Sequence, residues 1–274
     1  MIKGLYNSAM GMLVQEASLN TSSNNLANVN TIGYKKDRVT FEEFPNYEEL
    51  RLNDTKITPG RKFYEGPVIG RMGTGVILDR VTTNHDSGTL RQTGNRTEMA
   101  LDGKAYFMVQ TPEGIRYSKD GRFHFSQDGY LVNRHGHKVM GLEGTLEPNS
   151  PVTDKEGKLA PYFKPILVEN KLNFQVNETG AVVGQGIEVL KVVFENTNAL
   201  QKDGKTLYQL TDGKAIYSSE PILKQGFVET SNVNVVNEMV NMIKISRAYE
   251  ANSKILTGID ERLGQTVREV GTLR

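Results

Sequence analysis

The sequence contains neither cysteine nor tryptophan among its 274 residues. The absence of cysteine excludes disulfides, zinc–thiolate sites and cysteine nucleophiles. Lysine and arginine (33) nearly balance aspartate and glutamate (32), so the chain lacks the basic field that bulk nucleic-acid binding needs. It also lacks an apolar run near the ~18 residues of a membrane helix and the features of a cleaved signal peptide. We therefore expect a cytosolic protein, or one that leaves the cytosol without a cleaved signal.

Side chains for catalysis or metal binding are sparse. The histidines are His85, His124, His135 and His137. His135 and His137 are spaced as on a strand, but no neighbouring cluster supplies the third ligand that a site needs, so we interpret them as surface or turn residues. Gly70, Gly73 and Gly75 resemble a phosphate loop but fit neither Gly-x-Gly-x-x-Gly nor a glycine followed by Lys-Ser/Thr. The sequence predicts no catalytic residue, no metal site and no cofactor.

Residues 73 to 226 carry the signals of short strands separated by turns. Asp-Gly, a favoured hairpin dipeptide, occurs at residues 102–103, 120–121, 128–129, 203–204 and 212–213. The clearest hairpins join Arg122–Phe125 to Tyr130–Val132, and Tyr106–Gln110 to Ile115–Tyr117. Further strands are expected at Leu172–Val176, Ile187–Phe194 and Leu207–Leu210. The pattern predicts an all-β module.

Two stretches of the chain lack this regularity. Residues 37 to 71 are irregular, with Phe41, Phe44 and Tyr47 as possible anchors, and we interpret them as a connecting arm or an extended loop. Residues 142 to 165 are polar and contain four prolines, so we expect a long loop or an insertion there. The aromatic residues of the β module are expected to form core and cross-strand pairs, with a carbohydrate-binding face as the alternative.

Both ends of the chain carry an apolar stripe with a period of seven residues, the pattern of a coiled-coil seam. The N-terminal stripe is Leu5, Met12, Leu19 and Leu26. The C-terminal stripe is Val235, Met242, Tyr249, Leu256 and Leu263, with Ile245 and Ile259 at companion positions. The two stripes predict helices that form either an intramolecular hairpin or a contact between subunits, and we favour the contact between subunits.

Helical periodicity stops abruptly after the first stripe. The run from Asn24 to Tyr34 is rich in asparagine and contains Gly33, and such residues favour turns and helix ends. The fold class predicted is α+β: N- and C-terminal helices paired as a coiled-coil domain, with an all-β domain inserted between them. The expected domains are residues 1–35 with 230–274, a connecting arm at 36–72, and a β-rich outer domain at 73–229.

Three blocks of the sequence resemble the flagellar axial proteins, and the basal-body rod proteins in particular. They are NNLANVNTIGYKKDRVTF (24–41), the body segments beginning GTGVILDRVTTNHDSG (73–88) and YFMVQTPEGIRYSKDGRF (106–123), and GFVETSNVNVVNEMVNMIKISRAYEANSKIL (226–256). The resemblance covers most of the chain in the right order. It implies a structural protein and not an enzyme: a rod subunit that assembles into a helical tube and transmits torque from motor to hook.

The resemblance also implies roles for single residues. Leu5, Met12, Leu19 and Leu26 would pair with Met242, Tyr249, Leu256 and Leu263 as an assembly seam. The link from helix to outer domain would be shaped by Asn24, Asn25, Asn28, Thr31, Gly33 and Tyr34, and the return by Gly226, Glu229, Ser231 and Asn232. We expect the helices to meet both within one subunit and between subunits.

The implied partners are other copies of the chain, neighbouring axial proteins and the flagellar type III export apparatus, with no nucleic acid and no small-molecule ligand. The implied location is the basal body, outside the cytoplasm after export. A proximal-rod subunit is favoured over a distal-rod subunit. The competing class is a secreted β-rich binding protein whose terminal helices form a closed monomeric stalk.

Overall fold

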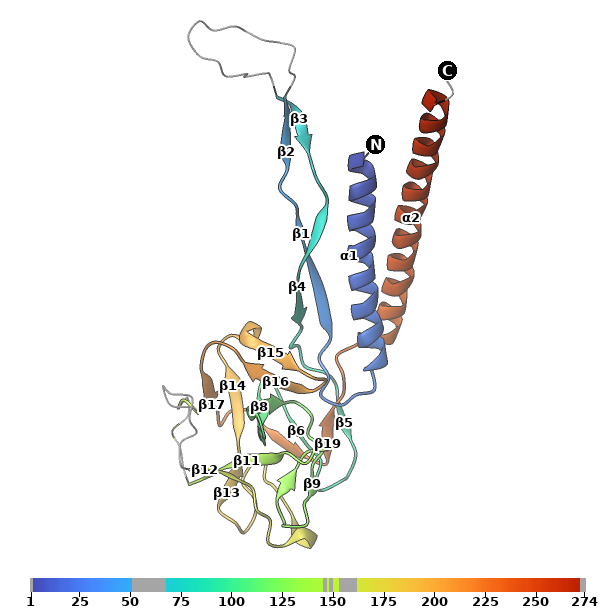
Figure 1. The fold of residues 1–274 in the computed structure, drawn as a ribbon. Helices are drawn as coiled ribbons and strands as arrows, with labels where there is room; N and C mark the ends of the chain where they lie inside the picture. Colours follow the sequence, from blue (N-terminus) through green and yellow to red (C-terminus); the bar gives the residue numbers. More distant parts are fainter. Residues whose placement is uncertain (1, 51–67, 145–146, 148–149, 153–161, 272–274) are drawn as a thin grey trace, which may run out of the picture. The chain divides into compact units, whose positions relative to one another are not determined.

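The computed structural model describes residues 2–50, 68–144, 147, 150–152 and 162–271. It has one helix near each end of the chain, α1 (Ile2–Ala27) and α2 (Val235–Gly271), with the β strands between them (Figure 1). The predicted α+β class is therefore confirmed. The chain divides into two compact units: a helical unit (residues 1–24, 38–82 and 236–274) and a body (residues 25–37 and 83–235).

The two helices of the helical unit run antiparallel. A Cβ added at Gly4 would lie 3.4 Å from Ile259 Cδ1, and one added at Gly11 would lie 2.8 Å from Asn252 Nδ2. Residue numbers thus rise along α1 where they fall along α2, and Figure 1 shows the start of α1 and the end of α2 at the same end of the pair. The glycines let the helix backbones approach closely because they present no side chain there.

The segment expected to be irregular contains strands. Strand β1 (Asp37–Glu43) pairs with β4 (Val76–Thr83), and β2 (Tyr47–Leu50) pairs antiparallel with β3 (Val68–Met72). Most side chains of β1 and β4 are exposed. The expectation of no regular element failed because a strand exposed on both faces lacks the alternation of a half-buried strand.

The body is built around one large sheet. Its main path runs β15-β16-β8-β7-β11-β10-β9, with β12 and β13 on β11, and with β14 joining β7 and β17. The strands are β7 (Tyr106–Thr111), β8 (Gly114–Ser118), β9 (His124–Phe125), β10 (Leu131–Val132), β11 (Lys138–Glu143), β12 (Phe163–Pro165), β13 (Ile187–Val189), β14 (Lys191–Phe194), β15 (Leu200–Asp203), β16 (Leu207–Leu210) and β17 (Ala215–Tyr217). Two separate pairs are β5 (Leu90–Gln92) with β19 (Phe227–Glu229), and β6 (Met99–Leu101) with β18 (Leu223–Gln225).

The central strand β7 contributes to two hydrophobic cores. Phe107 and Val109 belong to one buried cluster and Tyr106 and Met108 to the other. Because successive side chains of a strand point to opposite faces, this alternation means that both faces of the sheet are covered. The aromatic residues of the module pack in edge-to-face pairs, such as Phe107 on Phe123 at 5.0 Å between ring centroids. The prediction of aromatic core pairs is confirmed.

The hairpins predicted from turn residues are present. β7 and β8 pair across Gly114, and β9 pairs with β10 across Gly129; both glycines have positive φ. Four of the five Asp-Gly glycines have positive φ, and Gly121 is the exception. A Cβ at Gly121 would overlap Met99 O, so this position needs glycine for space.

Two strand predictions were wrong in detail. Leu172–Val176 is not a strand: Lys171–Asn173 forms a short 3₁₀ turn and Val176 makes one isolated bridge to Val182. The run Ile187–Phe194 is divided into β13 and β14 at Leu190. A second short 3₁₀ turn covers Thr197–Ala199. Most of the stretch from 145 to 161 lies outside the described residues.

Candidate assembly surfaces and helix roots

The predicted seam residues lie on partly covered faces of the two helices. On α1, the seam positions Leu5, Met12, Leu19 and Leu26 are half-buried. On α2, the half-buried seam positions are Val235, Met242, Ile245, Leu256, Ile259 and Leu263. Tyr249 is the exception, at 38% exposed. The polar Asn252 falls within the α2 stripe and faces Gly11 of α1.

A second apolar face on α2 has no cover in the described chain. Val236, Met239, Val240 and Ile243 are exposed, Val236 by 68%. The spacing 236, 240, 243 places three of them on one side of the helix. Soluble proteins rarely leave such clustered apolar side chains in water unless the surface binds something. The sequence reasoning missed this face because it followed only the period of seven, although the spacing was readable.

The asparagine-rich turn after α1 is tightly bonded. Asn25 Nδ2 donates to Asp37 O (2.8 Å), while Asn25 Oδ1 accepts from Asp37 N (2.9 Å) and from the Tyr34 hydroxyl (3.1 Å). Thr31 Oγ1 donates to Asn28 Oδ1 (3.2 Å). Asn25, Asn28 and Tyr34 are buried, whereas Asn24 is exposed. The side-chain bonds fix the path of the chain where the helix stops.

The return segment before α2 meets this turn. Gly33, with φ +69°, donates its N–H to Glu229 O (2.8 Å). Asn232 Oδ1 accepts from Lys36 N (2.8 Å), and Asn232 Nδ2 donates to Asn84 O (2.9 Å). The structure thus brings together Gly33 and Glu229, which are 196 positions apart in the numbering (229 minus 33).

The other two return residues also make hydrogen bonds, Gly226 to a distant segment and Ser231 to its own. Gly226 O accepts from Thr93 N (2.7 Å) and Gly94 N (3.1 Å), and its φ is +79°. Ser231 Oγ accepts from Val233 N (3.2 Å). These bonds shape the strand β19 and the short segment that follows it.

A buried charged group at this junction was not predicted from the sequence. Lys35 Nζ lies 2.6 Å from Glu229 Oε1, and Lys119 Nζ lies 3.0 Å from Glu229 Oε2. All three side chains are at most 2% exposed. We call Lys35, Glu229 and Lys119 the buried triad. Lysine in a Tyr-Lys-Lys run is usually solvated, so only the spatial arrangement reveals it.

Opposite charges decide the ionisation of Glu229. Burial alone would raise the pKa of the Glu229 carboxyl, but the ammonium groups of Lys119 and Lys35 together outweigh it and hold that pKa below its ordinary value. Burial lowers the pKa of Lys119, and the like charge of Lys35 adds to this, against the opposing attraction of Glu229. A carboxylate between two ammonium groups stays ionised at neutral pH.

The burial of His85, next to the triad, predicts that the body loses stability in acid. His85 Nδ1 lies 2.7 Å from the Tyr106 hydroxyl. Burial, with the charges of Lys35 and Lys202, lowers the pKa of His85 from 6.5 to about 4, while Asp37 opposes and Lys119 adds to the lowering. The unfolded chain therefore binds this proton near pH 6.5 and the folded chain only near pH 4. Stability falls as pH drops through that window and levels off below it.

We expect a loss of about 1–2 kcal/mol between pH 6.5 and 4, after discounting for the partial exposure of His85. Urea unfolding of the wild type and of His85→Gln at pH 7 and 4.5 measures it. Glutamine keeps a polar partner for Tyr106 but binds no proton, so the variant should show a smaller loss over the same interval. Equal losses in both proteins would contradict the assignment to His85.

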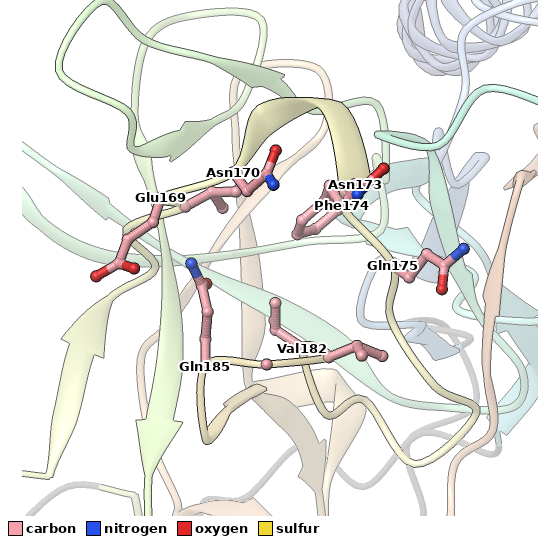
Figure 2. Close-up of a pocket in the computed structure, with 10 residues that line it drawn as sticks. Glu169, Asn170, Asn173, Phe174, Gln175, Val182 and Gln185 are labelled. Atoms are coloured by element: carbon pink, nitrogen blue, oxygen red, sulfur yellow. The ribbon is translucent and has the colours of Figure 1, made fainter.

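One polar groove of about 510 Å³ lies in the body. It is lined by Val168–Asn170, Asn173–Gln175 and Val182–Gln185 (Figure 2). With its amide oriented to satisfy both neighbours, Gln185 donates to Leu167 O (3.0 Å) and accepts from Glu169 N (2.8 Å). The amide of Gln185 is thus engaged with the backbone, and the groove's single carboxyl group, Glu169, has no histidine, lysine or second carboxyl beside it in the lining.

Two features are absent from the residues that the structure describes. Within them, no three histidine, aspartate or glutamate side chains gather as metal ligands. His135 and His137 lie with ring centroids 6.0 Å apart in a turn, as interpreted from the sequence. Neither described helix has the length and apolar content to cross a membrane.

Three family models match successive parts of the chain. They are "Flagella basal body rod protein" at residues 5–35, "Flagellar hook protein FlgE/F/G D1 domain" at 100–184, and "Flagellar basal body rod FlgEFG protein C-terminal" at 224–269. The first and third matches include most of the two helices and most of the segments that join the helices to the body, residues 25–37 and 226–235, which we call the helix roots. The second lies within the body.

Curated relatives match over almost the whole chain. The flagellar basal-body rod protein FlgG of Buchnera aphidicola subsp. Schizaphis graminum is 34% identical over 96% of this chain and 98% of its own. FlgG of Bacillus subtilis is 30% identical over 97% and 98%. The hook-basal body complex protein FlhO of B. subtilis is 30% identical over the full length of both. The chain therefore belongs to the flagellar basal-body rod protein family and is a structural subunit of the rod.

Proposed function

We propose that the terminal helices line a helical tube, the rod, and that they meet both within one subunit and between subunits. The observation that carries this is the division of α2 into two apolar faces. The seam from Val235 to Leu263 is half-buried, whereas Val236, Met239, Val240 and Ile243 remain exposed. One covered and one open face on the same helix suit a contact inside the subunit and a second contact outside it.

In this proposal residues 1–35 with 230–274 form the coiled-coil domain, 36–72 the connecting arm and 73–229 the outer β domain. Torque would pass through many parallel contacts. Each apolar side chain buried at an interface contributes ~1.5–3 kcal/mol, and every added subunit repeats the set. The role is mechanical, and no catalytic step is assigned to the chain.

The remaining proposals concern place and partners. We propose that the subunit is exported without a cleaved signal through the flagellar type III apparatus and assembles outside the cytoplasm on neighbouring axial proteins. The names of the relatives mention the rod but specify neither its proximal nor its distal part. The proximal rod stays our favoured position, with the distal rod as the alternative. Immunogold labelling of isolated basal bodies at the base or the hook end of the rod distinguishes these positions.

Concentration-dependent assembly tests the tube. We expect the purified full-length protein to form tubes or fibres at high concentration, seen by sedimentation and negative-stain electron microscopy. Circular dichroism should show helicity rising as they form, because the ends gain order on docking. A protein that stays monomeric, with both ends as resistant to protease as the body, would instead support the closed stalk of a secreted binding protein.

A further inference from the structure

The helix roots, residues 25–37 and 226–235, are packed against the body by buried charges. We infer that Glu229 is a positioning residue that fastens both chain ends to the body through Lys35 and Lys119, and that the roots form a rigid clasp and not a hinge. Every contact in this argument lies inside the body unit. The inference is therefore independent of how subunits assemble.

Glu229 joins three segments that are distant in the sequence. Lys35 belongs to the linker after α1, Lys119 follows β8, and Glu229 ends β19. Each carboxylate oxygen takes one lysine, at 2.6 and 3.0 Å, and Oε1 also accepts the backbone N–H of Gly88 at 2.8 Å. Both oxygens are thus committed, one toward the N-terminal linker and the other toward the body.

The lysines use their remaining donors on backbone oxygens. Lys35 Nζ donates to Asp86 O at 2.7 Å, and Lys119 Nζ donates to Gly103 O at 2.7 Å and Leu101 O at 3.3 Å. Buried ammonium groups with several hydrogen bonds and an opposite charge are tolerated, whereas a lone buried charge is not. The three groups must therefore be buried together or released together, which makes closure of the clasp cooperative.

A second ion pair holds the linker from another side. Lys202 Nζ lies 2.9 Å from Asp37 Oδ2, donates to Lys35 O at 2.8 Å, and lies 4.0 Å from the centre of the Tyr34 ring. Lys202 comes from β15 in the large sheet. Residues 34 to 37 thus contact Lys202 of the large sheet on one side and Glu229 of β19 on the other.

The division of the chain agrees with a rigid clasp. The body unit comprises residues 25–37 and 83–235. Two of its boundaries, after Asp37 and after Thr82, fall within β1 and β4, and the two at the helices fall after Asn24 and after Val235. These last two boundaries lie inside helices, at the last turn of α1 and the first residue of α2. The asparagine-rich turn predicted as a hinge is on the body side of the boundary, with its side chains bonded.

Hydrogen exchange of the full-length protein tests the clasp. The reporters are the amides of Gly33, bonded to Glu229 O, of Lys36, bonded to Asn232 Oδ1, and of Thr230, bonded to Thr89 O. Lys35→Met removes the N-terminal tie and leaves the Lys119–Glu229 pair. We expect exchange of the Gly33 and Lys36 amides to rise at least about tenfold, with Thr230 and β7 unchanged.

Glu229→Gln should release both ends, so that all three reporter amides exchange faster. If this variant unfolds the body as well, the exchange rates of Lys35→Met alone decide whether the roots form a clasp. The matched control is Lys224→Met, which removes a lysine from the exposed pair with Asp102 at 2.9 Å. Exchange of Gly33 and Lys36 within about twofold of wild type in Lys35→Met would overturn the clasp, and so would an equal rise in the control or throughout β7.

Discussion

Replacing Gly33 by alanine is expected to destabilise the body by about 3–5 kcal/mol, in the range that single substitutions rarely reach. Gly33 has φ +69°, a conformation that costs about 1 kcal/mol for a residue with a side chain. The added Cβ would also overlap Asp120 N and lie 2.5 Å from Lys119 C. These are backbone atoms next to the triad, so they cannot move aside as a flexible side chain would.

The clash forces the linker away from the body. Moving Gly33 would break its N–H bond to Glu229 O and pull Lys35 from its carboxylate partner. Urea unfolding followed by circular dichroism measures the loss, and hydrogen exchange locates it. We expect the first protected amides lost to be those of residues 33 to 37.

Gly94 provides the matched control. Its φ of +76° is close to that of Gly33, but a Cβ there would meet no atom within 4 Å. Gly94→Ala should therefore cost only about 1 kcal/mol, the price of the backbone conformation alone. Similar losses in the two variants would show that positive φ, and not close packing on the body, explains the need for glycine at residue 33.

The sequence predicted those features whose physical cause is local or periodic. A period of seven needs only one side of a helix to be covered, and it placed Met242, Leu256 and Leu263 on the covered side of α2. A hairpin needs a turn residue that accepts positive φ, and Gly114 and Gly129 marked two of them. The family resemblance rested on four segments. The family models overlap three of them, at residues 24–41, 106–123 and 226–256, whereas the segment at 73–88 lies outside the matches.

Features that depend on distant pairing were out of reach. Lys35 and Glu229 are 194 residues apart, and nothing in either neighbourhood distinguishes a buried lysine from a solvated one. The roots were predicted as turns from Asn25 and Gly33, which is correct for the backbone, yet the charges that lock the turn are invisible in the local pattern. The strands of the arm were not predicted for a different reason: most of their side chains are exposed, so they lack the alternation of a half-buried strand.

The spacing of the open-face residues of α2 can be read from the sequence, but the sequence does not show which face of the helix is covered. The sequence shows that Val236, Val240 and Ile243 are apolar and share one side of the helix. Only the partial burial of Met242 and Ile245 on the neighbouring side shows that Val236, Val240 and Ile243 are left uncovered. In the proposed rod, the same helix would offer one surface to its own chain and a second surface to another subunit.

Changing Leu256 to aspartate is expected to abolish rod assembly and motility while leaving the body folded. Leu256 is half-buried on the α2 seam and belongs to the helical unit. The substitution removes ~1.5–3 kcal/mol of apolar burial and places a charge against an apolar stripe, a further cost at each subunit. Because a tube repeats each contact, the loss accumulates with every subunit added. Swarm-plate motility, electron microscopy of basal bodies and the near-ultraviolet spectrum of the body measure the three effects.

Ala251→Asp places the same charge five residues earlier on α2, at an exposed position that belongs neither to the seam nor to the open face of Val236, Val240 and Ile243, and should leave assembly nearly intact. Five residues along a helix turn the side chain by about 140°, so the two variants differ in the helix face they alter and little in their position along the helix axis. Assembly retained in Leu256→Asp would contradict the seam. If both variants failed, the helix would tolerate no added charge on either face, and the contact between subunits would have to surround α2 and not follow a stripe.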